Sequence, residues 1–485
     1  MRRTKIVCTI GPATRAPENL RRLAEAGMDV VRLNFSHGTQ DEHAATIADI
    51  RAMSQAIGKP ITILQDLSGP KVRVGTIAGN HAVLEPDAEF VLTSEPCEGN
   101  EHEASVSIPE IVESVPAGAH LLLDDGLIDL VVTGRKGDRL YTKVVIGGVL
   151  STHKGVNAPG VSLPIAAVTD KDLDDLRFGI QQKVDWIAAS FIRSANDIAV
   201  LRGVCNAARA RIPIIAKIEK HEAVSNIDEI LSAVDGVMVA RGDLGVEIPI
   251  DEVPVVQKMI IKKANAAGKP VITATQMLDS MIRNPRPTRA EVSDVANAII
   301  DGTDAIMLSG ETAVGAYPFL AVSMMDQISQ YTEPSLSLRP AVIDNWPRPE
   351  SSDQQAYLEA ITRTIAQATY TAAQDLNAAA IIAATSTGMT ALAISRHRPN
   401  VPIVAFTTVQ RTFTRLGLVW GVIPVLAREV VTSDDMMQES ISAALRIGAA
   451  KDGDIVVLTG GVPVNLPGST NFLKVHRIGQ PLLHA

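Results

Sequence analysis

A lysine and two carboxylates follow short apolar runs of the sequence, in the segments "IIAKIE" and "VMVARGD". They are Lys217, Glu219 and Asp243. Carboxylate oxygens are the ligands that Mg²⁺ prefers, with substrate oxygens and water completing its octahedron. Lys217 lies two residues before Glu219, so both side chains point to the same side of an extended strand, where the lysine adds a mobile positive charge. Together these residues would bind a metal ion and stabilise an anion, although an exposed ion pair is the simpler explanation of an isolated "KIE".

Polar residues also end the other apolar runs, which makes the exposed ion pair the weaker explanation. A lone "RGD" is weak evidence, but Gly242 lets backbone N–H groups approach an oxyanion. No Walker A motif occurs, so a nucleotide would bind outside that scheme. The remaining polar residues at the ends of these runs are Arg32, Asn34, Ser36, Asp66, Arg241, Thr275, Ser309 and Glu311.

The alternation of β-rich runs with helical patterns indicates how these side chains meet. Three such runs precede residue 71 and five follow residue 157, and their near-continuous apolar character suits parallel strands buried on both faces. Eight strands predict a (β/α)8 barrel built from residues 1–70 and 158–331, with an open doubly wound sheet as the main alternative. In such a barrel the carboxyl ends of the strands share one rim, where catalytic groups lie.

The segment 71–157 breaks this alternation. It is Gly-rich and contains short alternating strands, which predicts an inserted small β-barrel domain. Gly69, Pro70, Pro159 and Gly160 mark its two hinges. We expect this domain to be a mobile lid that excludes water from the rim.

A second α/β unit is predicted at 355–485, after a proline-rich linker at 332–354. Strands and helices alternate again along this unit. Its first helix is expected to bury the face that carries Leu358, Ile361, Ile365, Ala368 and Ala372.

Composition excludes several classes of protein. The 485 residues carry a net charge of −9, with 45 basic against 54 acidic residues and no basic run, so neither a nucleic acid nor a membrane surface is an expected partner. Three widely spaced cysteines predict no disulfide framework or zinc site. Cysteine usage of this kind fits a reducing cytoplasm, which is the expected location. The apolar run near the N-terminus is too short for the core of a signal peptide.

For each of four residues, the sequence context alone leaves two roles open. His37 in "NFSHG" is a candidate general base, but orienting its loop is favoured over that role. Arg73 and Lys154 stand at the two ends of the insertion. For each, contact with a phosphate and a solvated surface charge are equally good interpretations. Lys71 in "DLSGPKVR" is either a surface charge or a fixed cation of the site.

Many ordered segments resemble the pyruvate kinase family along nearly the whole chain. The matching segments are "KIVCTIGPAT", "VRLNFSHG", "GPKVRVG", "KGVNAPG", "IIAKIEK", "MVARGDLGVEIP", "ATQMLDSMI" and "PRPTRAEVSDVANAIIDGTDAIMLSGETAVGAYP".

The resemblance implies phosphoryl transfer from phosphoenolpyruvate to ADP, giving pyruvate and ATP, the final step of glycolysis, with Mg²⁺ or Mn²⁺ as cofactor. It also implies a homotetramer. One alternative is a catalytically silent protein on the same fold that senses phosphometabolites. Another is a metal-dependent barrel that acts on phosphoenolpyruvate by C–C or C–P chemistry.

The resemblance implies a role for each site residue. Lys217 would neutralise the transferring phosphoryl group and the enolate, Glu219 and Asp243 would hold the metal, and Arg32 would contact the substrate phosphate. Gly242 and Thr275 would fix the carboxylate of pyruvate. Protonation of the enolate is expected near Thr275 and Ser309, with the donor unassigned. The expected nucleotide-side residues are Asn34, His37, Arg73 and Lys154.

Three positions depart from the family pattern. Lys220 stands where many members have asparagine. Leu67 and Lys71 replace a threonine and a glutamate of K⁺-using members, whose ion also contacts residues matching Asn34, Ser36 and Asp66. We therefore expect no requirement for K⁺, with the Lys71 ammonium supplying that charge.

The loop "TSTGMT" resembles the family's effector phosphate loop only loosely. It gives the C-terminal domain an expected regulatory role, with a phosphorylated small molecule as effector. An ordinary helix cap is the alternative. The expected contact residues are Thr385, Ser386, Thr387, Gly388 and Thr390.

Overall fold

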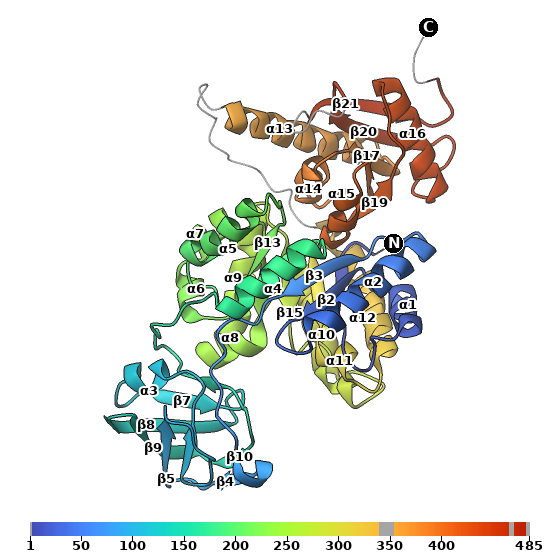
Figure 1. Ribbon diagram of the computed structural model, residues 1–485. Coiled ribbons are helices and arrows are strands. Elements are labelled where there is room, and N and C mark those ends of the chain that lie inside the picture. The colour runs from blue at the N-terminus through green and yellow to red at the C-terminus, as the bar shows by residue number, and fades with distance from the viewer. Residues whose placement is uncertain (1, 339–353, 465–469, 482–485) are drawn as a thin grey trace.

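The computed structural model describes residues 2–338, 354–464 and 470–481. Figure 1 shows a central barrel, a small β domain at one end of the molecule and an α/β domain at the other. Among the described residues, no helix combines the length and apolar character needed to cross a membrane.

Eight parallel strands close the central barrel, which confirms the predicted (β/α)8 architecture. The side chains of these strands are mostly buried because the barrel interior covers one face and the helices cover the other. Around the barrel the strands are β1 (Lys5–Thr9), β16 (Ala305–Leu308), β15 (Val271–Ala274), β14 (Gly236–Ala240), β13 (Ile214–Ile218), β12 (Trp186–Ala189), β3 (Thr62–Asp66) and β2 (Val30–Asn34).

The barrel helices begin at clear sequence signals. Thr39, Thr169 and Thr288 each form a capping box with an acidic residue three positions later, which satisfies backbone N–H groups of the first turn. The helices are α1 (Pro17–Ala26), α2 (Gln40–Ile57), α4 (Asp170–Gln181), α5 (Ala195–Ala207), α6 (His221–Ser225), α7 (Ile227–Ala233), α8 (Arg241–Glu247), α9 (Val253–Ala266), η2 (Asp279–Ile282), α10 (Arg289–Asp301), α11 (Gly310–Ala313), α12 (Pro318–Thr332) and η3 (Glu333–Leu338).

The inserted segment forms a β domain with its own aliphatic core around Phe90. Its strands pair as a six-stranded sheet, β11-β7-β8-β9-β5-β6, and a two-stranded sheet, β10-β4. We call this domain the lid. Its elements are η1 (Ala78–Asn80), β4 (Ala82–Leu84), β5 (Glu89–Thr93), β6 (Glu103–Ser105), α3 (Glu110–Ser114), β7 (His120–Leu123), β8 (Ile128–Lys136), β9 (Arg139–Ile146), β10 (Gly148–Leu150) and β11 (Val156–Asn157).

The C-terminal domain is an α/β unit, as predicted. Its sheet has the order β19-β18-β17-β20-β21, with β21 antiparallel at one edge. Most of the predicted linker at 332–354 lies outside the described residues. The elements are α13 (Gln354–Asp375), β17 (Ala380–Ala384), α14 (Met389–Ser395), β18 (Ile403–Thr407), α15 (Gln410–Arg415), η4 (Leu416–Leu418), β19 (Val422–Leu426), α16 (Ser433–Arg446), β20 (Ile455–Gly461) and β21 (Thr470–Arg477).

The predicted buried face of α13 is wrong, although the helix itself is present. Leu358 and Ala368 are exposed, and Ile361, Ile365 and Ala372 are only half-buried. The helix packs against β20, β21 and α14, and these neighbours cover a different face from the one that carries the longer aliphatic side chains. The buried residues are Thr362, Ala366, Thr369, Tyr370 and Ala373.

The C-terminal domain closes the base of the barrel, at the end opposite the lid (Figure 1). Leu418 is fully buried and packs with the side chains that fill the barrel interior. Around it, the Lys5 ammonium donates to the Val422 carbonyl at 2.7 Å and the Trp186 indole donates to the Arg415 carbonyl at 3.1 Å. The barrel interior is therefore sealed at its base by a loop from another domain.

Candidate active site

The strand ends bring a lysine, an arginine and two carboxylates together at the rim, as predicted. Lys217 is near the end of β13, and its Nζ lies 2.7 Å from Glu219 Oε1 and 3.4 Å from Asp66 Oδ1. Arg32, on β2, donates from Nε to Asp66 Oδ2 at 2.5 Å. Because Glu219 and Asp66 are 1 % exposed, these contacts act in an environment where water screens charge weakly.

Lys217 remains charged in this setting. Burial lowers its pKa, but the Asp66 and Glu219 carboxylates outweigh that effect, so the pKa is raised above the ordinary lysine value. The site therefore holds a permanent ammonium. Such a preorganised charge stabilises an anion that develops beside it.

The two buried carboxyl groups respond in opposite directions. Burial opposes ionisation of Asp66, but Lys217 and Arg32 together bring its pKa below the ordinary value. Burial raises the pKa of Glu219, Lys217 offsets part of that rise, and the Asp243 carboxylate adds to it. A bound cation would relieve this repulsion between Glu219 and Asp243.

The rim fits a divalent cation. Glu219 Oε1 and Asp66 Oδ1 are buried oxygens that face Lys217 Nζ, at 2.7 Å and 3.4 Å, and have no other donor among the described residues. Glu219 and Asp243 follow the adjacent strands β13 and β14. The described residues contain no cluster of three or more metal-ligating side chains. One or two carboxylates with open positions are the arrangement that Mg²⁺ uses with phosphate substrates.

Lys71 faces the rim from the hinge of the lid. Its Nζ lies 3.8 Å from Asp243 Oδ1, and its side chain is 35 % exposed. Leu67 is buried in the core between the barrel and its helices and has no oxygen to offer an ion. Asp66 is engaged with Arg32 and Lys217, and Asn34 Oδ1 accepts from the backbone N–H of Ser36.

Gly242 and Thr275 meet after β14 and β15. The Gly242 N–H donates to Thr275 Oγ at 2.8 Å. Thr275 has a φ of +65°, which is strained for a β-branched residue. Arg241 holds this backbone, since its Nη2 donates to the Thr275 carbonyl and its Nη1 to Asp294, both at 2.7 Å. The strain is typical of a functional site.

Two further predicted rim residues follow β16, of which Glu311 is buried and Ser309 is half-buried. Glu311 accepts from the N–H groups of Ser309 and Leu278, and burial raises its pKa. Ser309 Oγ is buried and has no hydrogen-bond partner among the described residues. It is thus available to a substrate or a water molecule.

The expected nucleotide-side residues divide between barrel and lid. His37 is exposed, and no hydrogen bond of its imidazole occurs in the described chain. Arg73 donates to the His153 carbonyl at 2.8 Å, and Lys154 pairs with Asp124 at 2.8 Å. These two cations therefore belong to the lid, and its position decides whether they reach the rim.

The predicted effector residues lie at a pocket in the C-terminal domain. Hydroxyl groups of Thr385, Ser386, Thr387, Thr390 and Thr470 line it, without a lysine or arginine among the described lining residues. Gly388 has a φ of +91°, and its N–H donates to Thr385 Oγ.

Sequence reasoning missed several residues of the rim. Ser190 follows β12, accepts from Lys217 Nζ at 2.7 Å and donates to the Leu67 carbonyl at 2.7 Å. The backbone N–H of Phe191 donates to Glu219 Oε2 at 2.7 Å. Thr9 accepts from Arg32 Nη1 at 3.0 Å. The rule that found the others, a polar residue at a strand end, also fits Thr9 and Ser190.

A (β/α)8 barrel with a buried ammonium, paired carboxylates and a lid inserted after the third strand defines a class: barrel enzymes that act on an anionic substrate. The family model described as "Pyruvate kinase, barrel domain" matches residues 1–322, and "Pyruvate kinase, alpha/beta domain" matches 363–476.

Curated relatives agree with these matches. Similar proteins named pyruvate kinase come from Geobacillus stearothermophilus, 49 % identical, and Sporosarcina psychrophila, 48 % identical; each match covers 99 % of this chain and 81 % of the relative. A protein named pyruvate kinase 2, from Synechocystis sp., is 47 % identical over 98 % of this chain and 79 % of its own length. This chain belongs to the pyruvate kinase family.

Proposed function

We propose that this protein transfers a phosphoryl group from phosphoenolpyruvate to ADP, giving pyruvate and ATP in glycolysis. The buried Lys217 ammonium, held by Glu219 and Asp66 at the barrel rim, is the observation that carries the proposal. Phosphoryl transfer needs positioning and charge neutralisation more than covalent chemistry, and this rim offers both.

Each residue of the rim would have its own role in this reaction. Arg32, oriented by Asp66 and Thr9, would bind the substrate phosphate, and Lys217 would neutralise the group in transfer and the enolate left behind. The Gly242 N–H and the Thr275 hydroxyl, already in contact, would fix the carboxylate. Ser309, with its unpartnered hydroxyl, would help to order the water that protonates the enolate.

Glu219 and Asp243 would hold the divalent cation. When bound, Mg²⁺ or Mn²⁺ supplies positive charge that offsets the charge on the transferring phosphoryl group. The lid would bring Arg73 and Lys154 to the nucleotide, with Asn34 and His37 on the barrel side. Two observations support these four nucleotide-side roles. Two of the residues lie on the lid and two on the barrel, and all four belong to segments that match the family.

The test is a coupled assay that measures pyruvate formed from phosphoenolpyruvate, ADP and MgCl₂. Turnover that requires all three components is expected. Absence of turnover with either Mg²⁺ or Mn²⁺, in a folded preparation, would overturn the proposal.

K⁺ independence is part of the same proposal. Its support is that the buried Leu67 brings no oxygen to an ion, while the Lys71 ammonium lies beside Asp243 at the rim. The proposal extends to a cytoplasmic homotetramer, as the family resemblance implies, and to a phosphorylated effector at the hydroxyl-lined pocket of the C-terminal domain.

A further inference from the structure

Two carboxylates, one buried and one partly exposed, fasten the exit side of the lid to the barrel. Asn157, at the end of β11, donates from Nδ2 to Glu247 Oε1 at 2.9 Å. Ser162, just beyond the hinge, donates from Oγ to Glu222 Oε1 at 2.8 Å. Glu247 is the more deeply placed of the two acceptors, with a side chain 1 % exposed against 17 % for Glu222.

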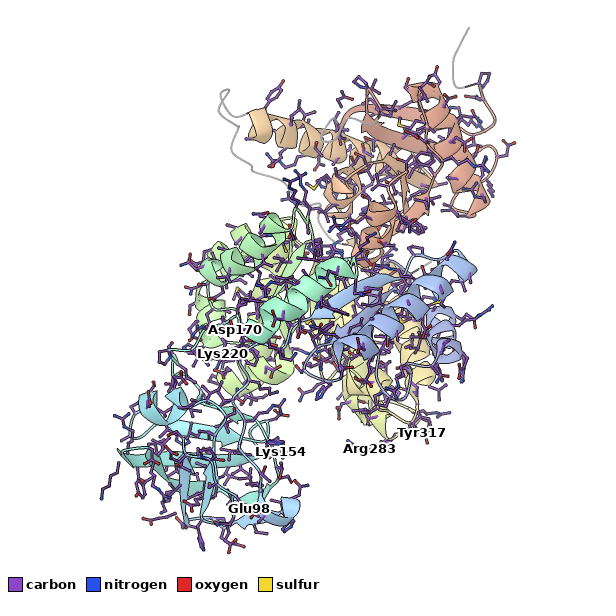
Figure 2. The ribbon with its side chains drawn as sticks, in the orientation of Figure 1. Glu98, Lys154, Asp170, Lys220, Arg283 and Tyr317 are labelled. Carbon is purple, nitrogen blue, oxygen red and sulfur yellow. The ribbon has the colours of Figure 1, made fainter. Side chains whose placement is uncertain are left out.

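Glu247 also joins the two segments that carry the candidate metal ligands. It is the last residue of α8, whose first turn contains Asp243. The same Oε1 atom lies 2.6 Å from Nζ of Lys220, the residue after Glu219. Figure 2 labels Lys220 where the barrel meets the lid. We call the Asn157–Glu247–Lys220 contacts the hinge clasp.

The other oxygen of Glu247 has no hydrogen-bond donor among the described residues. Its neighbour is His221, whose Nδ1 lies 4.0 Å from it and 3.2 Å from Glu222 Oε2. A buried carboxylate with an unused oxygen is a poor source of folding stability, since its loss of hydration is only partly compensated. A role in orienting the lid accounts for the group better than a role in stability.

The entry strand of the lid is fastened differently. Ser68 Oγ and the Gly69 N–H both donate to Asp172 Oδ1, and Asp172 completes the N-terminal capping box of α4. That attachment ties the entry strand to the end of a long barrel helix and makes no contact with the candidate metal ligands. Lys71 also reaches the rim from the entry side, where its Nζ lies 3.8 Å from Asp243 Oδ1, but both side chains of that ion pair are partly exposed. The hinge clasp on the exit strand differs because its contacts converge on a carboxylate that is 1 % exposed.

We propose that Glu247 is a positioning residue, which sets the orientation of the lid through Asn157 and so places Arg73 and Lys154 over the nucleotide. The lid base is one antiparallel ribbon, in which Arg73 pairs with Gly155 and the Val74 N–H donates to the Lys154 carbonyl. Both cations lie on this ribbon, and Asn157 lies three residues beyond Lys154. The inference rests on the proposed function, because the nucleotide is ADP in that reaction.

The decisive variant is Asn157→Ala, which cuts the lid from Glu247 and leaves the barrel side of the clasp intact. Because phosphoenolpyruvate contacts barrel residues, its KM should stay within about twofold, whereas the KM for ADP should rise about tenfold, the size expected for one hydrogen bond to a charged group. The melting temperature should fall by only a few degrees, because Glu247 Oε1 keeps its contact with Lys220 Nζ. Asn297→Ala is the control, since Asn297 is exposed on α10 and bonds only within that helix.

The role of Glu247 is tested by two substitutions, one that keeps a hydrogen-bond acceptor for Asn157 and one that removes it. Glu247→Gln keeps an oxygen that can accept from Asn157, so its KM for ADP should stay within about threefold of wild type. Glu247→Ala should resemble Asn157→Ala or exceed it. If Glu247→Ala fails to fold, the Asn157 and Gln variants still decide the question.

A readout that does not depend on activity uses spin labels on the lid and the barrel. Lys136→Cys and Ala48→Cys, both exposed, are introduced with Cys97→Ser, because the other two cysteines are buried. Asn157→Ala should broaden or shift the distance distribution between the labels. An unchanged distribution, or equal changes in the two KM values, would overturn the inference. Inactive wild-type protein would instead refute the proposed function.

Discussion

At the scale of single residues, Lys217 is the group on which turnover depends most. Asp66 and Glu219 keep it charged where water screens weakly, so its charge is fully available to a developing anion. Lys217→Met should lower kcat by a factor on the order of 10² to 10³, as for loss of one preorganised electrostatic group.

The fold should survive this substitution. The pKa of Glu219 is already raised, so the carboxyl can take up a proton when its cation is removed, and Asp66 keeps Arg32. Steady-state turnover and a thermal melt are the measurements. Lys258→Met, on the surface of α9 beside Asp301, is the matched control. A Lys217 variant within a few fold of wild type would refute the assigned role.

Lys71 leads to a prediction about ionic requirements. A tethered ammonium beside an anionic phosphate supplies the unit charge that a K⁺ ion would supply, and a second free cation beside it would be repelled. Turnover with Mg²⁺ present should therefore stay within about twofold when K⁺ is replaced by a tetraalkylammonium salt at equal ionic strength. A tenfold loss, about 1.4 kcal/mol of transition-state stabilisation, would show that Lys71 does not replace the ion.

Several site residues could be predicted because each stands next to an apolar run in the sequence. Lys217, Glu219, Asp243 and Thr275 were found in this way, since the barrel brings all strand ends to one rim. Arg241 was placed at the rim without a role, because its partner Asp294 lies on a helix 53 residues away. Glu247 ends a short helix, and its partners lie 27 and 90 residues away in sequence. No local pattern reveals such contacts.

At the scale of elements, the pocket beside β17 and α14 leads to a prediction about regulation. Its polar lining consists of hydroxyl groups, which can donate to phosphate oxygens without the charge of a lysine or arginine. A sugar phosphate or nucleoside monophosphate should shift the phosphoenolpyruvate saturation curve. Ser386→Ala should raise the half-saturating concentration of that effector about tenfold, as expected for one lost hydrogen bond to a charged group.

The control for this pocket is Ser442→Ala, because Ser442 is exposed on α16 and bonds only to that helix. If the whole panel of phosphorylated compounds leaves the saturation curve unchanged, the threonine and serine side chains serve only as a helix cap.

Element types were predicted more reliably than the faces they bury. Strands of the barrel followed from uninterrupted apolar runs, because burial on both faces leaves no alternative pattern. The buried face of α13 was wrong because the largest aliphatic residues were assumed to face the sheet. Thr369 and Ala373 are buried in their place, on a helix that packs against β20, β21 and α14. The face that this helix buries depends on its neighbours in the fold, which the sequence does not state.

At the scale of the whole molecule, a buried lysine lies where the C-terminal domain meets the barrel. Burial lowers the pKa of Lys5 to about 8, and the nearby Asp29 carboxylate offsets this only in part. The unfolded chain therefore binds more protons than the folded protein between about pH 8 and the ordinary lysine pKa of 10.5. Stability should rise with pH across that window and lose this contribution as pH falls through about 8.

The measurement is denaturant unfolding between pH 7.5 and about pH 10, the window set by the linkage relation. Because cysteine, tyrosine and other lysines also titrate there, the informative quantity is the difference between wild type and Lys5→Met. The wild type should gain stability relative to the variant as pH rises. A difference that is flat, or that falls with pH, would contradict the assignment.

The position of Leu418 leads to an expectation about truncated forms of the protein. Its side chain completes the packed interior of the barrel from below, although it is encoded far downstream of the last barrel strand. A premature stop codon between the two domains would still encode every residue of the catalytic rim. The product would nevertheless have an opening in its base, with the apolar ends of eight strands in contact with water, and exposed apolar surface of that kind promotes aggregation. Nonsense mutations between the end of α12 and the codon for Leu418 should therefore yield insoluble protein, not an active shortened enzyme.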